Sequence, residues 1–318
     1  MRAITSSRSP CSPVAKSVLC SIAHKQDAAS GEHGDLLDLI SLNRGHTNLR
    51  DTLEEARAFL SLPARSRSSP SAHACKGSRQ PAPRDTKGAA RRLFAASRPL
   101  PGSLAETYLR SRGITAPLRF PALRFHPGCY YRADDKAPPE AWPALIGAVT
   151  DLSGNITGVL RTWLARDGSA KAPLSDPRRA MGDLLGNAVR FGVVEACPGL
   201  RAGVLAAGEG IETMLSLKSV VPALPMAAAL SAGHLAGLLL PPSLRRLYVA
   251  ADNDLAGRRA ATRLMARARA AEIEAFLLLP RGKDYNVDLC ALGSLRVLDD
   301  VAAQLTGQDT ARFVPRKA

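Results

Sequence analysis

The chain has 318 residues, with 43 Lys and Arg against 28 Asp and Glu and a formal net charge of +15. This length suffices for two or three small domains with a buried core, and the positive charge favours an anionic polymer as partner. Only 4% of the residues are aromatic, so we expect phosphate contacts with strong salt dependence rather than extensive base stacking.

The cysteine pattern and the hydropathy argue against other classes of protein. The six cysteines are scattered without a CxxC pair, which disfavours a disulfide framework and a closed zinc site. The longest apolar stretch, around residues 235–240, ends at Pro241-Pro242 and is too short for a membrane span. Lys16 interrupts the apolar part of the first twenty residues, so a secretion signal is not expected. We therefore expect a cytoplasmic protein without membrane contact.

The first third of the chain contains three segments of different composition. Residues 1–30 contain many serines and are expected to form an irregular leader. Residues 31–62 place apolar side chains at helical spacing and predict a small helical segment. Residues 63–92 combine Pro, Ser and Ala with eight basic residues and a single acid, Asp85. This composition predicts a basic, disordered linker.

Residues 93–200 mix helix and strand. A short helix is expected to end at Gly113, and two strands are expected at residues 144–149 and 156–163. The intervening residues 151–155 have the composition of a hairpin turn. The segment is therefore predicted to form a smaller α+β subdomain.

Residues 201–296 alternate regularly between strand and helix patterns. The strands are expected at residues 204–207, 225–230, 246–251 and 273–279, and the helices at 211–218, 233–240 and 255–271. This order predicts an α/β domain with a parallel four-stranded sheet and helices on both faces. Residues 297–318 are expected to form a C-terminal tail.

Acidic residues follow three of these four strands. They are Glu209, the pair Asp252 and Asp254, and Asp284. Because the carboxyl ends of parallel strands meet at one edge of a sheet, we expect these side chains to lie close together. Such a cluster repels itself without a cation, and its hard oxygen ligands suit Mg²⁺ or Mn²⁺. The sequence therefore predicts a divalent-metal site for phosphoryl-transfer chemistry.

The three acidic blocks, in this order, resemble the Toprim domain that bacterial-type primases, topoisomerases and some nucleases share. The resemblance implies that Glu209 is the general acid or base and that Asp252 and Asp254 are metal ligands. Asp284 stands where primase-like members carry a third acid, which would complete the metal site. The alternative is a set of solvated loop acids on a plain α/β domain.

Residues 93–200 resemble the amino-terminal subdomain of the primase catalytic core, with a strand, a D-x-x-G turn, a strand ending in Arg, and then a Lys-containing segment. On this resemblance Arg161 and Lys171 would contact template and nucleotide phosphates; the alternative for both is a solvated surface. Lys283 would contact a phosphate or pair with an acid. Residues 31–62 resemble the end of the primase zinc-binding domain, but the expected cysteine pairs are missing. We therefore expect a degenerate remnant that does not bind zinc.

The resemblance implies a DNA primase-like nucleotidyltransferase of a mobile element. It would make short RNA primers on single-stranded DNA from nucleoside triphosphates, with Mg²⁺ or Mn²⁺ as cofactor. The chain has no G-x-x-x-x-G-K-[ST] motif, so a separate helicase is expected to unwind DNA. Two alternatives stay open: a Toprim-type nuclease, in which the same acids activate water, and a non-catalytic DNA-binding accessory protein. A topoisomerase is not expected, because the chain lacks room for a DNA gate.

Overall fold

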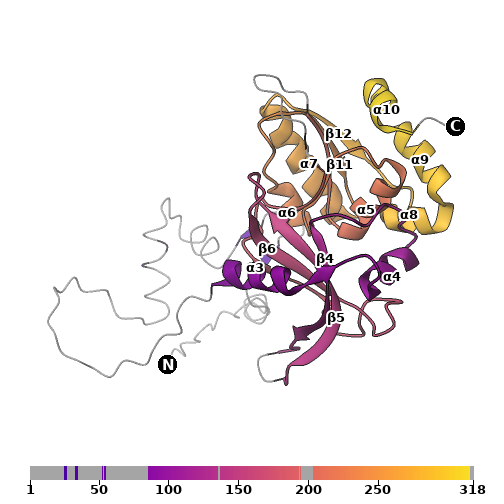
Figure 1. Ribbon diagram of the computed structural model, residues 1–318. Helices are drawn as coiled ribbons and strands as arrows, with labels where there is room; N and C mark the ends of the chain where they lie inside the picture. The colour runs from indigo at the N-terminus through magenta and orange to yellow at the C-terminus, as the bar shows by residue number, and fades with distance from the viewer. Residues whose placement is uncertain are drawn as a thin grey trace, which may run out of the picture. The chain divides into compact units, whose positions relative to one another are not determined.

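The computed structural model (Figure 1) describes residues 25–26, 33–34, 52, 54, 85–134, 137–192, 194 and 203–315. The chain divides into two compact units, residues 1–79 and 80–318. In the first unit, β1 (Lys25–Gln26) pairs antiparallel with β2 (His33–Gly34), and residues 52 and 54 are helical. The rest of the predicted leader and helical remnant, and residues 63–84 of the predicted linker, lie outside the described residues.

The second unit begins with an antiparallel sheet of five strands. They are β3 (Arg98–Pro99), β4 (Leu123–Tyr131), β5 (Glu140–Thr150), β6 (Ile156–Trp163) and β7 (Arg178–Gly182), which lie side by side in sequence order. Asp151 organises the predicted hairpin turn, because its Oδ1 accepts hydrogen bonds from the backbone N–H groups of Ser153 and Asn155, both at 2.9 Å. The predicted α+β character of this region is confirmed.

A helix replaces the last part of the predicted linker. Helix α3 (Thr86–Ala96) begins after Asp85, whose Oδ1 accepts a hydrogen bond from the backbone N–H of Gly88 at 2.7 Å. Ala90 and Phe94, four residues apart, are buried against the first sheet, and Figure 1 shows the helix crossing in front of its strands. The disorder expected for residues 86–92 is therefore wrong: the alanines favour helix, Asp85 caps it, and the sheet buries its apolar side.

The second sheet contains the four predicted parallel strands. They are β9 (Gly203–Gly208), β10 (Met226–Ala228), β11 (Leu244–Ala250) and β12 (Glu274–Leu278). The sheet order is β12-β11-β9-β10-β8, and the fifth strand, β8 (Val189–Phe191), is antiparallel to β10. The sequence did not indicate β8, because three residues carry too little periodicity to identify a strand.

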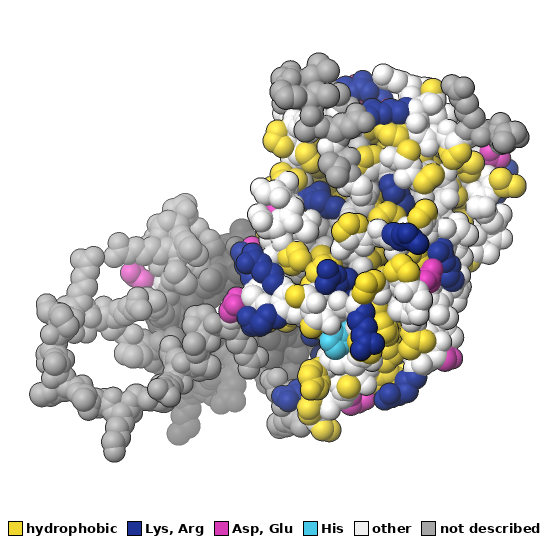
Figure 2. Space-filling view, viewed as in Figure 1, with side chains coloured by type: hydrophobic (Ala, Val, Ile, Leu, Met, Phe, Trp, Pro, Cys, Tyr) yellow, Lys and Arg dark blue, Asp and Glu magenta, His cyan; other side chains and the backbone are white. Residues whose placement is uncertain are grey.

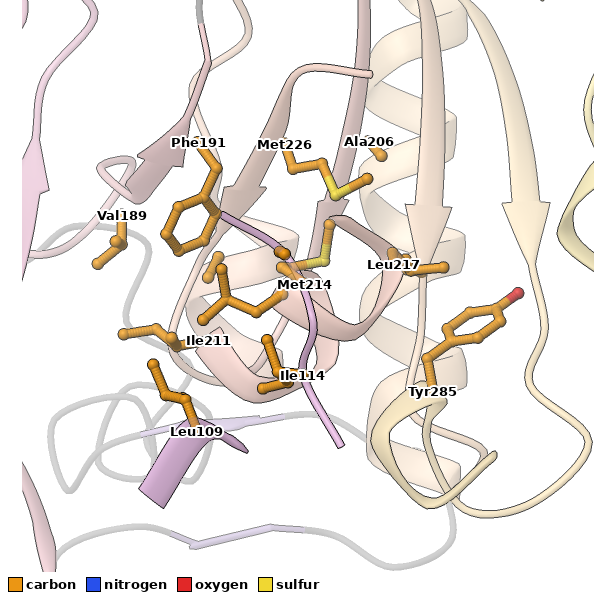
Figure 3. Packing of buried hydrophobic residues seen from close by; sticks show 14 of the residues in the cluster. Leu109, Ile114, Val189, Phe191, Ala206, Ile211, Met214, Leu217, Met226 and Tyr285 are labelled. Carbon is orange, nitrogen blue, oxygen red and sulfur yellow. The ribbon is translucent and has the colours of Figure 1, made fainter. Parts of the chain in front are cut away.

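Helices cover both faces of the second sheet, as predicted. They are α5 (Ile211–Val220) on one face, and α6 (Ala232–Ala236) and α7 (Leu255–Ala270) on the other. The face with α5 is also the side on which the two sheets share one core. Figure 3 shows Leu109 of α4 (Leu104–Ser111) and Ile114 beside Ile211 and Met214 of α5. This common core joins the two parts of the unit.

Three further helices end the described chain: α8 (Tyr285–Leu292), α9 (Ser294–Ala302) and α10 (Gly307–Phe313). Most of the segment expected as a tail is therefore helical, and Val297, Val301 and Phe313 are buried in the common core. The four-residue spacing of the two valines is the amphipathic signal that accounts for α9. None of the described helices is long and apolar enough to cross a membrane.

Candidate active site

The predicted acids lie at the carboxyl ends of adjacent strands. Strand β11 pairs with β9 on one side and with β12 on the other, and Ala250 is level with both Gly208 and Leu278. Glu209, Asp252 and Asp284 follow these three strand ends within a few residues. The order of the strands therefore explains why three blocks far apart in sequence lie at one edge.

Glu209 and Asp252 are half-buried, and both have raised pKa values. Burial raises the pKa of Glu209 to about 7, with further upward contributions from Asp252 and Asp254. Burial likewise raises the pKa of Asp252 to about 6, with contributions from Asp284 and Asp254. Glu209 Oε1 and Asp252 Oδ1 are buried without a hydrogen-bond partner. Buried polar atoms normally have a partner, so these two oxygens suit a cation or a proton.

Asp254 and Asp284 also cap helices. Asp254 Oδ1 accepts a hydrogen bond from the backbone N–H of Gly257 at 2.8 Å, at the start of α7. Asp284 Oδ1 accepts from the backbone N–H groups of Asn286 at 2.9 Å and Val287 at 2.8 Å, at the start of α8. One oxygen of each carboxylate is thus held by the backbone, which fixes the position of the side chain. The other oxygen of each is the one that a ligand would use.

Gly257 makes room for the two half-buried acids. A Cβ atom at this position would lie 2.4 Å from the Asp252 carbonyl oxygen and 2.9 Å from Glu209 Oε1. Such distances are far inside normal contact, so only glycine permits this approach between α7 and the strand ends. Gly257 was not among the residues predicted from the sequence, although its position three residues after Asp254 is the signal that could have found it.

Asn253 ties two acidic loops together. Its backbone N–H donates to the Lys283 carbonyl at 2.7 Å, and its Nδ2 donates to the Gly282 carbonyl at 3.1 Å. The charge of Lys283 acts to lower the pKa of Asp252. Lys283 is thus close enough to influence the acids, whereas Asn253 is a positioning residue that was not predicted from the sequence.

Lys171, one of the predicted basic residues, has a partner on helix α5. Lys171 forms an ion pair with Glu212, with Nζ and Oε1 3.1 Å apart, and Tyr108 OH donates to the same oxygen at 2.8 Å. Burial acts to raise the pKa of Glu212, but Lys171 and the hydrogen bonds outweigh it and the net shift is downward. Lys171 therefore connects the first sheet to the start of α5, the helix that follows Glu209 in the chain.

Arg178 is a further cation near the acids, and it was not predicted from the sequence. It lies on β7, and its charge acts to lower the pKa values of both Glu209 and Asp252. Arg161, by contrast, pairs in register with Arg179 and so shares the other face of the sheet. The structure brings Lys171, Lys283 and Arg178 to the side of the acids but not Arg161.

The donor set fits a hard divalent cation, although no cage is preformed. Within residues 85–134, 137–192 and 203–315, no group of three or more His, Cys, Asp or Glu side chains is arranged to hold a metal ion. The fit rests on the two buried oxygens without partners and on the mutual repulsion of the acids. Carboxylate oxygens of this kind are the ligands that Mg²⁺ uses.

The raised pKa of Glu209 makes stability depend on pH. Its ordinary value is 4.5 and its value in the folded protein is about 7, so the folded state binds the proton more tightly than the unfolded state. Stability without divalent cations should therefore fall as the pH rises from about 4.5 to about 7. We expect Glu209→Gln to be more stable than wild type at neutral pH in EDTA, by roughly 1–3 kcal/mol, and to lose this advantage in acid.

The matched control is Glu272→Gln, at an exposed glutamate outside the site. Thermal unfolding across this pH range measures both variants. An equal dependence of stability on pH in Glu209→Gln and Glu272→Gln would contradict the raised pKa of Glu209.

Comparison with known proteins agrees with this geometry. Residues 204–294 match the family model of the Toprim domain, and residues 84–191 match the model of a domain of unknown function, DUF7146. The four parallel strands of the second sheet and the helices α5, α6 and α7 therefore form a Toprim domain, and the acidic cluster lies at the edge of that sheet. No curated protein matches the chain.

Solved structures of bacterial primases are similar to this chain. The Aquifex aeolicus primase, comprising zinc-binding and RNA polymerase domains, matches with a TM-score of 0.50 and 16% identity over 86% of this chain and 71% of that one. A DNA primase domain from Pseudomonas aeruginosa matches with a TM-score of 0.47 and 15% identity, over 69% and 78%. The RNA polymerase domain of Mycobacterium tuberculosis primase, solved with double-stranded DNA carrying a 6-nucleotide overhang, has a TM-score of 0.41 and 15% identity, over 71% and 82%. The protein thus contains a Toprim domain and shares its fold with the Aquifex aeolicus primase structure.

Proposed function

We propose that the protein is a primase-type nucleotidyltransferase, which makes short RNA primers on single-stranded DNA from nucleoside triphosphates. The observation that carries the proposal is the pair of half-buried, unpartnered carboxylates Glu209 and Asp252 at the edge of the Toprim sheet. The fold shared with a primase catalytic core supports it.

In this proposal Asp252, Asp254 and Asp284 hold Mg²⁺ or Mn²⁺. The ion, when bound, neutralises negative charge on the triphosphate oxygens. Asp254 and Asp284 are suited to this role because backbone N–H groups fix one oxygen of each. Asp252 offers an oxygen that has no other partner.

Glu209 acts as the general base that accepts the proton of the attacking 3′-hydroxyl. A general base works best with a pKa near the operating pH, and burial brings the pKa of Glu209 to about 7. Arg178 and Lys283 supply positive charge beside the acids, suited to triphosphate oxygens. Lys171 forms an ion pair with Glu212, so in this proposal it joins the first sheet to the Toprim domain.

The partners follow from the proposed reaction. The template is single-stranded DNA and the substrates are nucleoside triphosphates; Figure 2 shows many Lys and Arg side chains and few acids on the described part of one face. Strand separation is assigned to a separate helicase. We further propose that the protein acts in the cytoplasm in the replication of a mobile element. Its activity is proposed not to require zinc.

Divalent-cation binding tests the metal ligands. We expect Mn²⁺ to bind the wild-type protein and Asp252→Asn to weaken that binding by about 10-fold or more, measured by electron paramagnetic resonance of free Mn²⁺. The control is Asp167→Asn, at an exposed aspartate that caps a local turn. Equal Mn²⁺ affinity in the two variants would remove Asp252 from the metal site.

A further inference from the structure

Helix α5 begins differently from α7 and α8. Its N-cap residue is Gly210, which has no side chain to bind the N–H groups of the first turn, whereas α7 and α8 begin at the capping aspartates Asp254 and Asp284. Glu209 comes directly before Gly210, and its carbonyl accepts a hydrogen bond from the Leu230 N–H at 2.8 Å. This bond holds the strand side of Glu209. The helix side depends on contacts with other parts of the chain.

Glu212 makes such a contact in the first turn of α5. It is buried, three residues after Glu209. Its Oε1 accepts a hydrogen bond from Tyr108 OH at 2.8 Å and forms an ion pair with Lys171 Nζ at 3.1 Å. Tyr108 is buried on α4, and Lys171 follows β6. Both partners therefore belong to the region before the Toprim domain, and they hold the helix start from outside that domain.

The protonation states of these groups suit a lasting contact. Burial and the Glu212 charge raise the pKa of Tyr108 well above its ordinary value, so its hydroxyl keeps the proton that it donates. Burial acts to raise the pKa of Glu212, but Lys171 and the hydrogen bonds outweigh it, so the carboxylate stays charged at neutral pH. Separating a buried carboxylate from its donor and its cation is costly. The start of α5 is therefore held in one position.

Two further hydrogen-bonded serines hold the same side of α5. Ser216 and Ser219 follow Glu212 at the spacing that places residues on one side of a helix. Ser216 Oγ accepts a hydrogen bond from Asn286 Nδ2 at 2.9 Å, and Ser219 Oγ accepts from the backbone N–H groups of residues 115 and 116, both at 3.0 Å. Ser219 lies in the last turn, at the opposite end of the helix from the acids. The two ends of α5 thus have separate contacts, which can be removed one at a time.

We propose that Tyr108 and Glu212 are positioning residues, which fix Glu209 for proton transfer in the proposed reaction. The inference rests on the proposed function. Glu212 holds the first turn of α5, and Tyr108 acts through Glu212. A small displacement of a catalytic group strongly lowers the rate of the chemical step. Loss of this contact should therefore slow the reaction while leaving the binding of metal and nucleoside triphosphate unchanged.

Tyr108→Phe removes the hydroxyl and keeps the buried ring. We expect it to lower the kcat of primer synthesis about 10-fold, with the KM for nucleoside triphosphates and the Mn²⁺ affinity within about 2-fold of wild type. Glu212→Ala should lower kcat at least as much. The double variant should be no slower than Glu212→Ala, because Tyr108 acts through Glu212. Additive losses, or a change confined to KM, would overturn the proposal.

The matched control is Ser219→Ala, which removes two hydrogen bonds at the opposite end of α5. It should lower stability and keep the wild-type kcat. A purely structural role of Tyr108 would make the two variants alike, so equal kcat values in Tyr108→Phe and Ser219→Ala would contradict the inference.

Amide hydrogen exchange in EDTA separates this inference from the proposed activity. Tyr108→Phe should speed exchange at residues 209–215 about 10-fold, and Ser219→Ala should leave exchange there as in wild type. If the wild-type protein makes no primers, the proposed function fails, and faster exchange in Tyr108→Phe would still support the positioning of Glu209. Unchanged exchange at these residues in Tyr108→Phe would overturn it.

Discussion

Replacing Gly257 by Ala is expected to slow primer synthesis by about 100-fold or more, because a misplacement of about 1 Å at a catalytic group has an effect of this size. The added Cβ would collide with the backbone carbonyl of Asp252 at 2.4 Å and with Glu209 Oε1 at 2.9 Å. Neither the strand end nor the start of α7 can move away without displacing both acids. Initial rates of primer synthesis, measured well below the unfolding temperature, test this expectation.

The control for Gly257→Ala is Gly233→Ala, also a glycine within a helix. A Cβ atom at Gly233 would meet nothing within 4 Å, and alanine in a helix is generally favourable. We expect Gly233→Ala to keep the wild-type rate. A wild-type rate for Gly257→Ala would show that the acids do not need the geometry described above.

Removing the Asp309 carboxylate should destabilise the protein by about 3–5 kcal/mol, the usual effect of breaking a buried ion pair from one side. Asp309 is 1% exposed, and its Oδ2 accepts hydrogen bonds from Arg246 Nη1 and Tyr248 OH, both at 2.7 Å. This contact attaches α10 to the interior strand β11. In Asp309→Ala the Arg246 guanidinium, also buried, would keep only Glu274 as a carboxylate partner.

Urea unfolding of Asp309→Ala beside Gln308→Ala measures this effect. Gln308 is the neighbouring residue on α10 and makes an exposed hydrogen bond with Arg245 at 3.2 Å, so its loss should change stability by less than about 1 kcal/mol. Similar stabilities of the two variants would show that the last helix contributes little to the fold.

The parallel sheet and its acidic edge could be predicted from the sequence because both depend on local patterns. Each of three apolar strands is followed closely by its acid, and parallel strands place such positions at one edge. Glu209, Asp252, Asp254 and Asp284 can therefore be recognised from the order of strands and acids along the chain. The helix caps at Asp254 and Asp284 can be predicted in the same way, since Asp is favoured at the N-cap position just before a helix.

The remaining parts of the site depend on contacts between distant segments. Arg178 approaches the acids only because the first sheet packs against α5, and nothing in its local sequence indicates that neighbour. Lys171 has Glu212 as partner for the same reason. Arg161 matched the primase pattern by its position at a strand end, yet strand alternation turns it to the opposite face.

Composition alone predicts too little structure for two segments of the chain. Residues 86–92 are basic and rich in Ala, but Ala90 and Phe94 form an apolar side that the first sheet buries. Val297 and Val301 do the same for α9. In both cases the burial that stabilises the helix comes from another part of the chain.

The most direct test is to incubate the purified protein with single-stranded DNA, labelled ribonucleotides and Mg²⁺ or Mn²⁺, beside the Glu209→Gln variant. We expect short labelled RNA products from the wild-type protein and none from the variant. Loss of the DNA that depends on Glu209, without RNA products, would contradict the primase assignment and identify a nuclease. DNA binding without either reaction would contradict the enzyme assignment as a whole and indicate an accessory protein.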